Sequence, residues 1–168
     1  MMEKLKLTVA VVTLSDKGSR GEREDLSGKL LLKFCQALGW NVKHYEILPD
    51  EEDLIVDKLC FLADVLKVDL ILTTGGTGVH PRDRTPDATS RVIDKEVPGI
   101  AEFIRFLSFQ KTAFSALSRA KAGIRGETLI INLPGSPKAI EEIFPHITEI
   151  IEHGIRKIKG DPHECARG

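Results

Sequence analysis

The sequence VDLILTTGGTG, residues 68–78, decides the fold, because an apolar run opens there directly into a glycine-rich turn. A short, continuous run of apolar and β-branched residues predicts a strand buried on both faces, over Val68–Thr74. Glycine at positions 75, 76 and 78 lets the backbone turn sharply and bring its N–H groups close to an anion, since a side chain would hold phosphate oxygens away. The stretch therefore predicts a buried strand followed by a turn, Gly75–Gly78, that binds a phosphorylated ligand, with nucleotides as the first candidates.

Two common nucleotide-binding motifs are absent from this turn. No Lys-Ser or Lys-Thr pair follows it at the P-loop spacing, and its glycines do not form the GxGxxG pattern of dinucleotide-binding proteins. A tight turn between a strand and a helix, without any ligand, is the alternative interpretation of the same glycines. Glycine turns are common, so the glycines alone do not distinguish a phosphate-binding turn from a purely structural one. Residues elsewhere in the chain are needed for that distinction.

Two further stretches share the continuous apolar character of residues 68–74. Leu7–Leu14 and Thr128–Leu133 are predicted to be buried strands, and Trp40–Leu48 is predicted to be extended up to Pro49. Residues 15–24 are polar and contain two glycines, which indicates a loop. Apolar residues at helical spacing predict helices over residues 25–38, 50–66, 85–95 and 100–110, and a last helix that starts at Ser136-Pro137.

The alternation of strands and helices predicts an α/β fold. Short connections between them favour a mostly parallel central sheet with helices on both faces, in three layers. We expect one domain over residues 1–168, with a frayed tail at residues 161–168. Pro145 lies inside the last predicted helix, and we expect it to kink that helix or split it in two.

Two of the predicted helices begin with residues typical of helix caps. Asp50 stands before one apolar stripe, and Thr85 precedes Pro86 at the start of another helix. Asp and Thr are favoured at the N-cap and Pro at the first helical position. We therefore expect the side chains of Asp50 and Thr85 to accept a hydrogen bond from the first turn of the helix that follows.

Three polar segments follow the three buried strands and are expected to meet. They are Ser15-Asp16, the turn Gly75-Gly76-Thr77-Gly78, and Pro134-Gly135-Ser136. In parallel α/β sheets, ligands bind in the crevice beyond the carboxyl ends of the strands. This convergence predicts one ligand site built from all three segments.

Two carboxylates near this crevice suggest a metal ion. Asp83 follows the glycine turn by five residues, and a carboxylate beside a bound phosphate is favourable only if a cation lies between them. Mg²⁺ prefers one or two carboxylates together with phosphates and water. Asp83 and Asp50 are therefore the candidate Mg²⁺ ligands and catalytic residues, and Asp50 is as well explained by helix capping.

Five basic residues are candidates for contact with an anion. Lys138 is the best placed of them, because it lies two residues into a helix that begins at a glycine turn. Most surface Arg and Lys side chains are merely solvated, so each of the others carries less weight. The full set is Arg82, Arg84, Arg119, Arg125 and Lys138.

Composition excludes two classes of partner. The net charge of −1 at pH 7, with Lys and Arg spread along the whole chain, argues against a nucleic-acid binder. The amino-terminal apolar run of eight residues is far too short to span a membrane and has no signal-peptide cleavage pattern. Three cysteines without CxxC spacing favour a reducing compartment, so we expect a soluble, cytoplasmic protein.

Several separate motifs resemble one family. The strings LTTGGTGVHPRDRTPDAT (residues 72–89) and SRAKAGIRGETLIINLPGSPKAI (residues 118–140) are similar to those of the molybdopterin adenylyltransferases of the MoaB/Mog family. Ser15-Asp16, residues 24–28 (EDLSG) and residues 48–51 (LPDE) resemble further motifs of the same family. The resemblance extends from about Leu7 to Gly160.

The resemblance implies a mostly parallel sheet flanked by helices and a homotrimer. It also implies Mg²⁺-dependent transfer of AMP from ATP to the terminal phosphate of molybdopterin, in molybdenum-cofactor biosynthesis, with a possible downstream partner that inserts the metal. Carried over to this chain, Gly75–Gly78 would hold nucleotide phosphates and Asp50 and Asp83 would serve the metal. Ser118, Pro134, Gly135 and Ser136 would line the same pocket.

Two alternatives remain open within this fold. The first is a non-catalytic protein that binds or carries molybdopterin, because some MoaB-type members of the family have the same glycine turn. The string TPDAT, residues 85–89, is closer to the Mog side and favours the enzyme. The second is a nucleotide pyrophosphatase domain of the kind found in competence-damage proteins, which normally carry a further domain.

Overall fold

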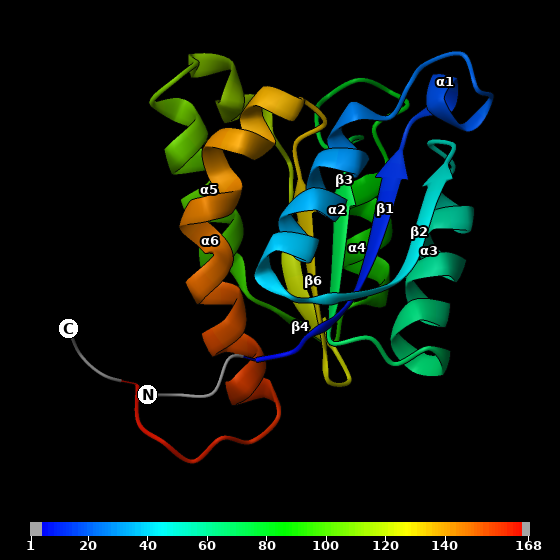
Figure 1. The fold of residues 1–168 in the computed structure, drawn as a ribbon. Coiled ribbons are helices and arrows are strands. Elements are labelled where there is room, and N and C mark those ends of the chain that lie inside the picture. Colours follow the sequence, from blue (N-terminus) through cyan, green and yellow to red (C-terminus); the bar gives the residue numbers. More distant parts are fainter. Residues whose placement is uncertain (1–4, 166–168) are drawn as a thin grey trace.

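A computed structural model describes residues 5–165, and a single twisted sheet organises them (Figure 1). Its strand order is β2-β1-β3-β6-β5-β4. The first four of these strands pair in parallel, whereas β5 and β4 are added antiparallel at one side. The strands are β1 (Thr8–Leu14), β2 (Asn41–Leu48), β3 (Leu70–Thr74), β4 (Lys95–Glu96), β5 (Ala122–Arg125) and β6 (Thr128–Leu133).

Helices cover both faces of this sheet, as expected (Figure 1). One face carries α2 (Leu26–Leu38), α5 (Pro98–Phe109) and α6 (Pro137–Ile158). The other carries α3 (Glu52–Cys60), with its π-helical continuation Phe61–Val65, and α4 (Thr85–Val92). None of the helices over residues 5–165 combines the length and apolar character needed to cross a membrane.

Strand β1 is buried on both faces, which explains its unbroken apolar sequence. Val9 and Val11 belong to the core beneath α2, α5 and α6, whereas Ala10 and Val12 belong to the core beneath α3 and α4. All four side chains are fully buried. Each strand alternates its side chains between the two faces, so a strand with helices on both sides needs apolar residues at every position.

The N-caps predicted at Asp50 and Thr85 are wrong, whereas Ser136 caps α6, as its position before Pro137 predicts. Glu51 caps α3 without a side-chain hydrogen bond, and Arg84 caps α4. The Asp50 carboxylate instead accepts a hydrogen bond from the backbone of Asp16, 3.1 Å away. The Thr85 hydroxyl donates to the carbonyl oxygen of Gly75 at 2.9 Å. Asp50 thus bonds the loop after β1, and Thr85 bonds the start of the loop that leads into α4, instead of the first turns of the helices that follow them.

Other boundaries differ locally from the prediction. The predicted loop over residues 15–24 contains a single helical turn, α1 (Asp16–Ser19), and the helix expected over residues 85–95 ends at Val92. The last helix is not split, because α6 continues through Pro145, and Figure 1 shows its axis bent near its first turns. Residues 161–165 form no helix or strand, and the remainder of the predicted frayed tail lies outside the described residues.

Candidate functional site

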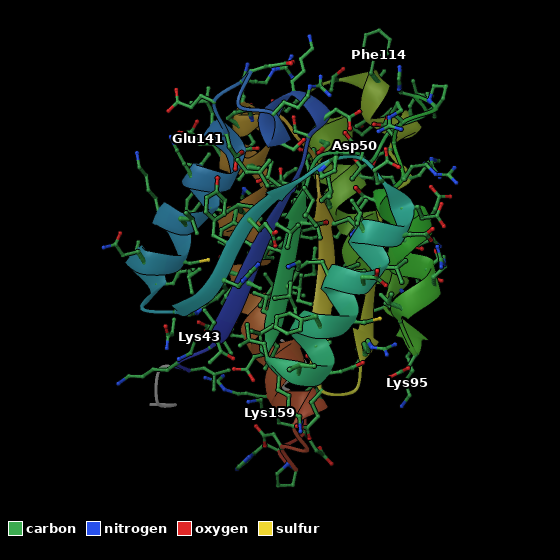
Figure 2. All side chains as sticks on the ribbon, turned by 90° about the vertical axis from the view of Figure 1, so that its right-hand side faces the viewer. Lys43, Asp50, Lys95, Phe114, Glu141 and Lys159 are labelled. Carbon is green, nitrogen blue, oxygen red and sulfur yellow. The ribbon has the colours of Figure 1, made fainter. Side chains whose placement is uncertain are left out.

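A cavity of about 560 Å³ opens beyond the carboxyl ends of the parallel strands. Loops that follow β1, β2, β3 and β6 all contribute to it. The three segments that were expected to meet, after β1, β3 and β6, each supply residues to its wall. Figure 2 shows Asp50 toward the same end of the molecule as Phe114, with Lys43 and Lys159 toward the other end. The predicted residues that line the cavity are Ser15, Asp16, Asp50, Gly75, Gly76, Arg82, Asp83 and Gly135.

The glycine turn after β3 is packed tightly against the chain around it. Gly75 and Gly76 have φ angles of +95° and +67°, in the left-handed region that favours glycine. A Cβ atom at Gly75 would lie 2.5 Å from the carbonyl oxygen of Leu14, and one at Gly76 would lie 2.5 Å from Thr85 Oγ1. Glycine is therefore required at both positions by the protein itself, before any ligand is considered.

The turn also leaves backbone donors available. The carbonyl oxygens of Gly76 and Thr77 accept hydrogen bonds from the backbone N–H groups of Thr85 and Arg119. Within residues 5–165, no acceptor bonds the N–H groups of Gly76, Thr77 or Gly78. Consecutive free N–H groups in a turn form a concave site for an anion. This arrangement supports a phosphate site over a purely structural turn.

Asp16 and Asp50 fix each other at the mouth of the cavity. The N–H of Asp16 donates to Oδ2 of Asp50 at 3.1 Å, and the N–H of Asp50 donates to Oδ1 of Asp16 at 3.0 Å. The two residues follow β1 and β2, which are neighbours in the sheet. Pairing of these strands therefore sets the position of the Asp50 carboxylate.

One oxygen of Asp50 has no partner. Oδ1 is buried and accepts no hydrogen bond in the described part of the chain. Burial, followed by the negative charges of Asp16 and Asp83, raises the pKa of Asp50 above its ordinary value. A buried carboxylate oxygen without a partner is costly, so this position is suited to accept a cation or a hydrogen-bond donor from a ligand.

Arg82 balances part of this negative charge. Its guanidinium holds both oxygens of Asp16, at 2.9 and 3.0 Å, and reaches Glu51 at 2.8 Å. The hydrogen bond from Arg82 is the main reason that the pKa of Asp16 lies below its ordinary value. Arg82 thus ties the loop after β3 to the loops after β1 and β2.

The acidic residues fit a magnesium ion that is shared with a ligand. Asp50 Oδ1 lies 2.9 Å from the position that a Cβ at Gly76 would take, and Asp83 Oδ2 lies at the same distance from that of Gly78. The two carboxylates therefore flank the glycine turn. Over residues 5–165, no cluster of three or more His, Cys, Asp or Glu side chains is arranged to hold a metal alone. Mg²⁺ requires only one or two carboxylates when phosphates and water complete its shell.

Other predicted site residues lie beside the cavity rather than on its wall. Thr77 and Gly78 continue the glycine turn, and Pro134 accepts a hydrogen bond from the Thr74 hydroxyl at 2.8 Å. Ser136 caps α6 through the N–H of Ala139 at 3.4 Å. Two further residues, Ser118 and Lys138, also do not line the cavity.

One wall of the cavity was missed by sequence reasoning. Asp25, at the start of α2, accepts hydrogen bonds from the Thr13 hydroxyl at 2.7 Å, from the N–H of Gly28 at 2.8 Å and from the Tyr45 hydroxyl. A Cβ at Gly28 would lie 2.0 Å from Asp25 Oδ2, so glycine is obligatory there. The resemblance of residues 24–28 to a family motif was a signal, but it assigned no role to them.

These features define a class: an α/β protein in which glycine amides and aspartates meet around a cavity beyond the carboxyl ends of its parallel strands. A family model described as "Probable molybdopterin binding domain" matches residues 10–153, and the chain belongs to this family.

Two relatives named molybdopterin adenylyltransferase support the assignment. The one from Helicobacter pylori strain J99 is 42% identical over 155 residues, covering 91% of this chain and 88% of the relative. The one from Escherichia coli K12 is 37% identical, covering 89% and 80%. A crystal structure of the molybdopterin biosynthesis enzyme MoaB from Thermus thermophilus matches with a TM-score of 0.86 and 44% identity, covering 94% and 99%.

Proposed function

We propose that this protein is a molybdopterin adenylyltransferase, which transfers AMP from ATP to the terminal phosphate of molybdopterin and releases pyrophosphate. The names of relatives that are 37% and 42% identical support this function. One observation carries it: the buried, unpartnered Oδ1 of Asp50 lies beside Gly76, in the turn whose N–H groups at residues 76–78 have no acceptor within residues 5–165. A carboxylate next to an anion site suits a reaction in which a metal joins the two.

In this reaction an oxygen of the molybdopterin phosphate attacks the α-phosphorus of ATP, and the bond from that phosphorus to the bridging oxygen breaks. The free N–H groups of Gly76, Thr77 and Gly78 would bind phosphate oxygens and keep the reacting groups in line. Asp50 and Asp83 would hold Mg²⁺, which when bound neutralises charge on the leaving pyrophosphate. The Asp16 backbone would keep Asp50 in place through its N–H.

The proposed activity also implies particular substrates, a location in the cell and an oligomeric state. We infer that the protein uses ATP and Mg²⁺ and that it acts in the cytoplasm. We also infer that it is a homotrimer. A protein that inserts the metal would receive its product. Exposed apolar side chains on α5 and on the 3₁₀ helix that follows it (Ala113–Leu117) support self-association. They are Phe106, Phe109, Phe114 and Leu117.

The decisive experiment is incubation of the protein with molybdopterin, ATP and Mg²⁺, followed by chromatography for adenylylated pterin and pyrophosphate. Formation of both in equal amounts supports the enzyme. Saturable molybdopterin binding without product would instead establish the carrier alternative. Pyrophosphate released from a nucleotide alone, without pterin, would favour the pyrophosphatase alternative.

A further inference from the structure

Arg119 joins two parts of the loop that follows β3 to the helix after that loop. Its Nε donates to the carbonyl oxygen of Gly78 at 2.8 Å, and its Nη2 donates to that of Asp83 at 2.7 Å. Both terminal nitrogens also bond the carboxylate of Asp87, in the first turn of α4, at 3.1 and 3.2 Å. The guanidinium fork therefore bonds the glycine turn, the backbone of Asp83 and α4 at once.

The backbone of Arg119 adds a bond that orients the free amides. Its N–H donates to the carbonyl oxygen of Thr77 at 2.7 Å. In a planar trans peptide the C=O of one residue and the N–H of the next point in opposite directions. Because the Thr77 carbonyl points at the Arg119 N–H, the N–H of Gly78 in the same peptide points away from Arg119. Two carbonyls of the turn, those of Thr77 and Gly78, are fixed in this way by one residue.

The guanidinium is occupied by protein groups and does not line the cavity. Asp87 neutralises it, and the hydrogen bond from Arg119 is the main reason that the pKa of Asp87 lies below its ordinary value. Arginine suits this role because its planar fork can bond a carboxylate with two nitrogens while bonding backbone carbonyls in the same plane. Lysine has a single ammonium group and cannot reproduce this geometry.

We propose that Arg119 is a positioning residue, which holds the amides of the glycine turn and the backbone of Asp83 in the geometry needed for phosphate and metal binding. This inference rests on the proposed function for its kinetic consequences. The sequence alone places Arg119 among possible anion contacts, whereas its donors are directed at the protein. Its effect on the reaction is therefore indirect, through Gly78 and Asp83.

Arg125 offers a matched control in the same chain. It also bonds one aspartate with two nitrogens, Asp64 at 2.7 and 2.9 Å, and one backbone carbonyl, that of Val92 at 2.8 Å. It pairs with Thr128 at the start of β6, whereas the glycine turn lies beyond the opposite end of the sheet. Arg125 therefore resembles Arg119 in its bonds but lies far from the site.

The first test needs no substrate. Hydrogen exchange of the full-length protein would be compared for the wild type, Arg119→Gln and Arg125→Gln, with Arg119→Lys as a milder variant if the Gln form folds poorly. The N–H groups of Asp83, Thr85 and Ala88 report on the loop, because each donates a backbone hydrogen bond there. We expect faster exchange at these amides only in the Arg119 variants. Unchanged exchange there would overturn the proposal, whatever the protein's activity.

The second test measures adenylyl transfer. We expect kcat to fall by roughly 10²-fold in Arg119→Gln, the cost of a misplaced site, and to recover in part when free guanidinium is added. Arg119→Lys should stay impaired, and Arg125→Gln should keep the wild-type kcat. Equal losses in the two Gln variants, or full activity in Arg119→Lys, would contradict the positioning role. A wild type that shows no transfer would refute the proposed function but leave the exchange test valid.

Discussion

Asp16 and Asp50 are joined by two reciprocal hydrogen bonds, in which each carboxylate accepts from the backbone N–H of the other residue. The arrangement occupies Oδ2 of Asp50 and leaves Oδ1 buried beside Gly76 without a partner. Two acidic side chains thus lie next to each other at the mouth of the cavity. Arg82, which bonds both oxygens of Asp16, offsets part of this charge.

Replacing Asp50 or Asp83 by Asn should separate catalysis from binding. Each change deletes a charge while keeping the shape of the side chain. We expect turnover to fall by about 10²-fold or more, roughly 3 kcal/mol, with little change in molybdopterin affinity, because the metal acts mainly on the transition state. Steady-state kinetics and pterin binding would be measured on both variants.

Asp53→Asn is the control for this pair, because Asp53 is a solvent-exposed carboxylate on α3, paired with Arg91. It should leave turnover unchanged. Asp50→Asn should also melt at a higher temperature than the wild type, since burial and the charges of Asp16 and Asp83 oppose ionisation of Asp50. Full Mg²⁺-dependent activity in both Asp50→Asn and Asp83→Asn would remove these residues from the catalytic site.

Gly76→Ala should abolish nucleotide binding. The new Cβ would need to displace Thr85 Oγ1, 2.5 Å away, and would approach Asp50 Oδ1 at 2.9 Å. Gly126→Ala is the matched control, because Gly126 also has a positive φ of 57° but open space around it. Backbone strain of about 1–2 kcal/mol applies to both variants, so a loss of ATP binding specific to Gly76→Ala reports the clash. Calorimetric titration with ATP would decide, and normal affinity in a folded Gly76→Ala protein would be inconsistent with the proposed phosphate site.

Ionised Asp69 should stabilise the folded protein, and this stabilisation should be lost in acid. Burial alone would raise its pKa, but bonds from Lys159 at 2.5 Å and from the N–H and hydroxyl of Thr8 at 2.9 and 3.0 Å outweigh burial and lower it. Because the folded-state pKa is depressed, the stabilisation is present above the ordinary value of 3.8 and is lost as the pH falls through the lower folded value. Urea unfolding as a function of pH should show a weaker acid dependence in Asp69→Asn. An unchanged slope below pH 3.8 would contradict this assignment.

Cys35 should resist thiol reagents in the folded protein. Its side chain is fully buried in the core, and burial raises the pKa of its thiol to about 12. Cys165 is exposed and should be modified first. Peptide mapping after iodoacetamide treatment at pH 8 should find Cys165 labelled and Cys35 protected until denaturant is added. Early labelling of Cys35 would show that the core beneath α2 opens readily.

Sedimentation equilibrium should give three times the 18.6 kDa mass of the chain. Phe114 is the most exposed of the apolar side chains around α5, at 80%, and we expect Phe114→Asp to shift the protein towards smaller species. Phe61→Asp is a suitable control, since Phe61 is also an exposed aromatic residue but lies on the α3 side of the sheet. A wild-type protein that sediments as a monomer at micromolar concentration would exclude the trimer.

The hydrogen-bond partners of Asp50 and Thr85 could not be predicted from the sequence. Asp after Pro49 and Thr before Pro86 are typical of N-caps, and local propensity alone favours that interpretation. In the folded protein the Asp50 carboxylate bonds the Asp16 N–H, and the Thr85 hydroxyl bonds the Gly75 carbonyl. The partner of Asp50 lies 34 residues away in another loop, and that of Thr85 lies 10 residues away at the start of the loop that leads into α4, so neither bond follows from the local cap pattern. Asp25 was missed for the same reason, because two of its partners are Thr13 and Tyr45.

What the sequence determined by itself is the sheet and the position of the glycine turn. Continuous apolar runs at residues 7–14, 68–74 and 128–133 must be buried on both faces, and strands of this kind belong to a parallel sheet with helices on each side. What only the tertiary structure decided is the orientation of polar groups around the turn. The free oxygen of Asp50 and the fork of Arg119 depend on hydrogen bonds between loops from different strands, whose partners become neighbours only when the sheet has formed.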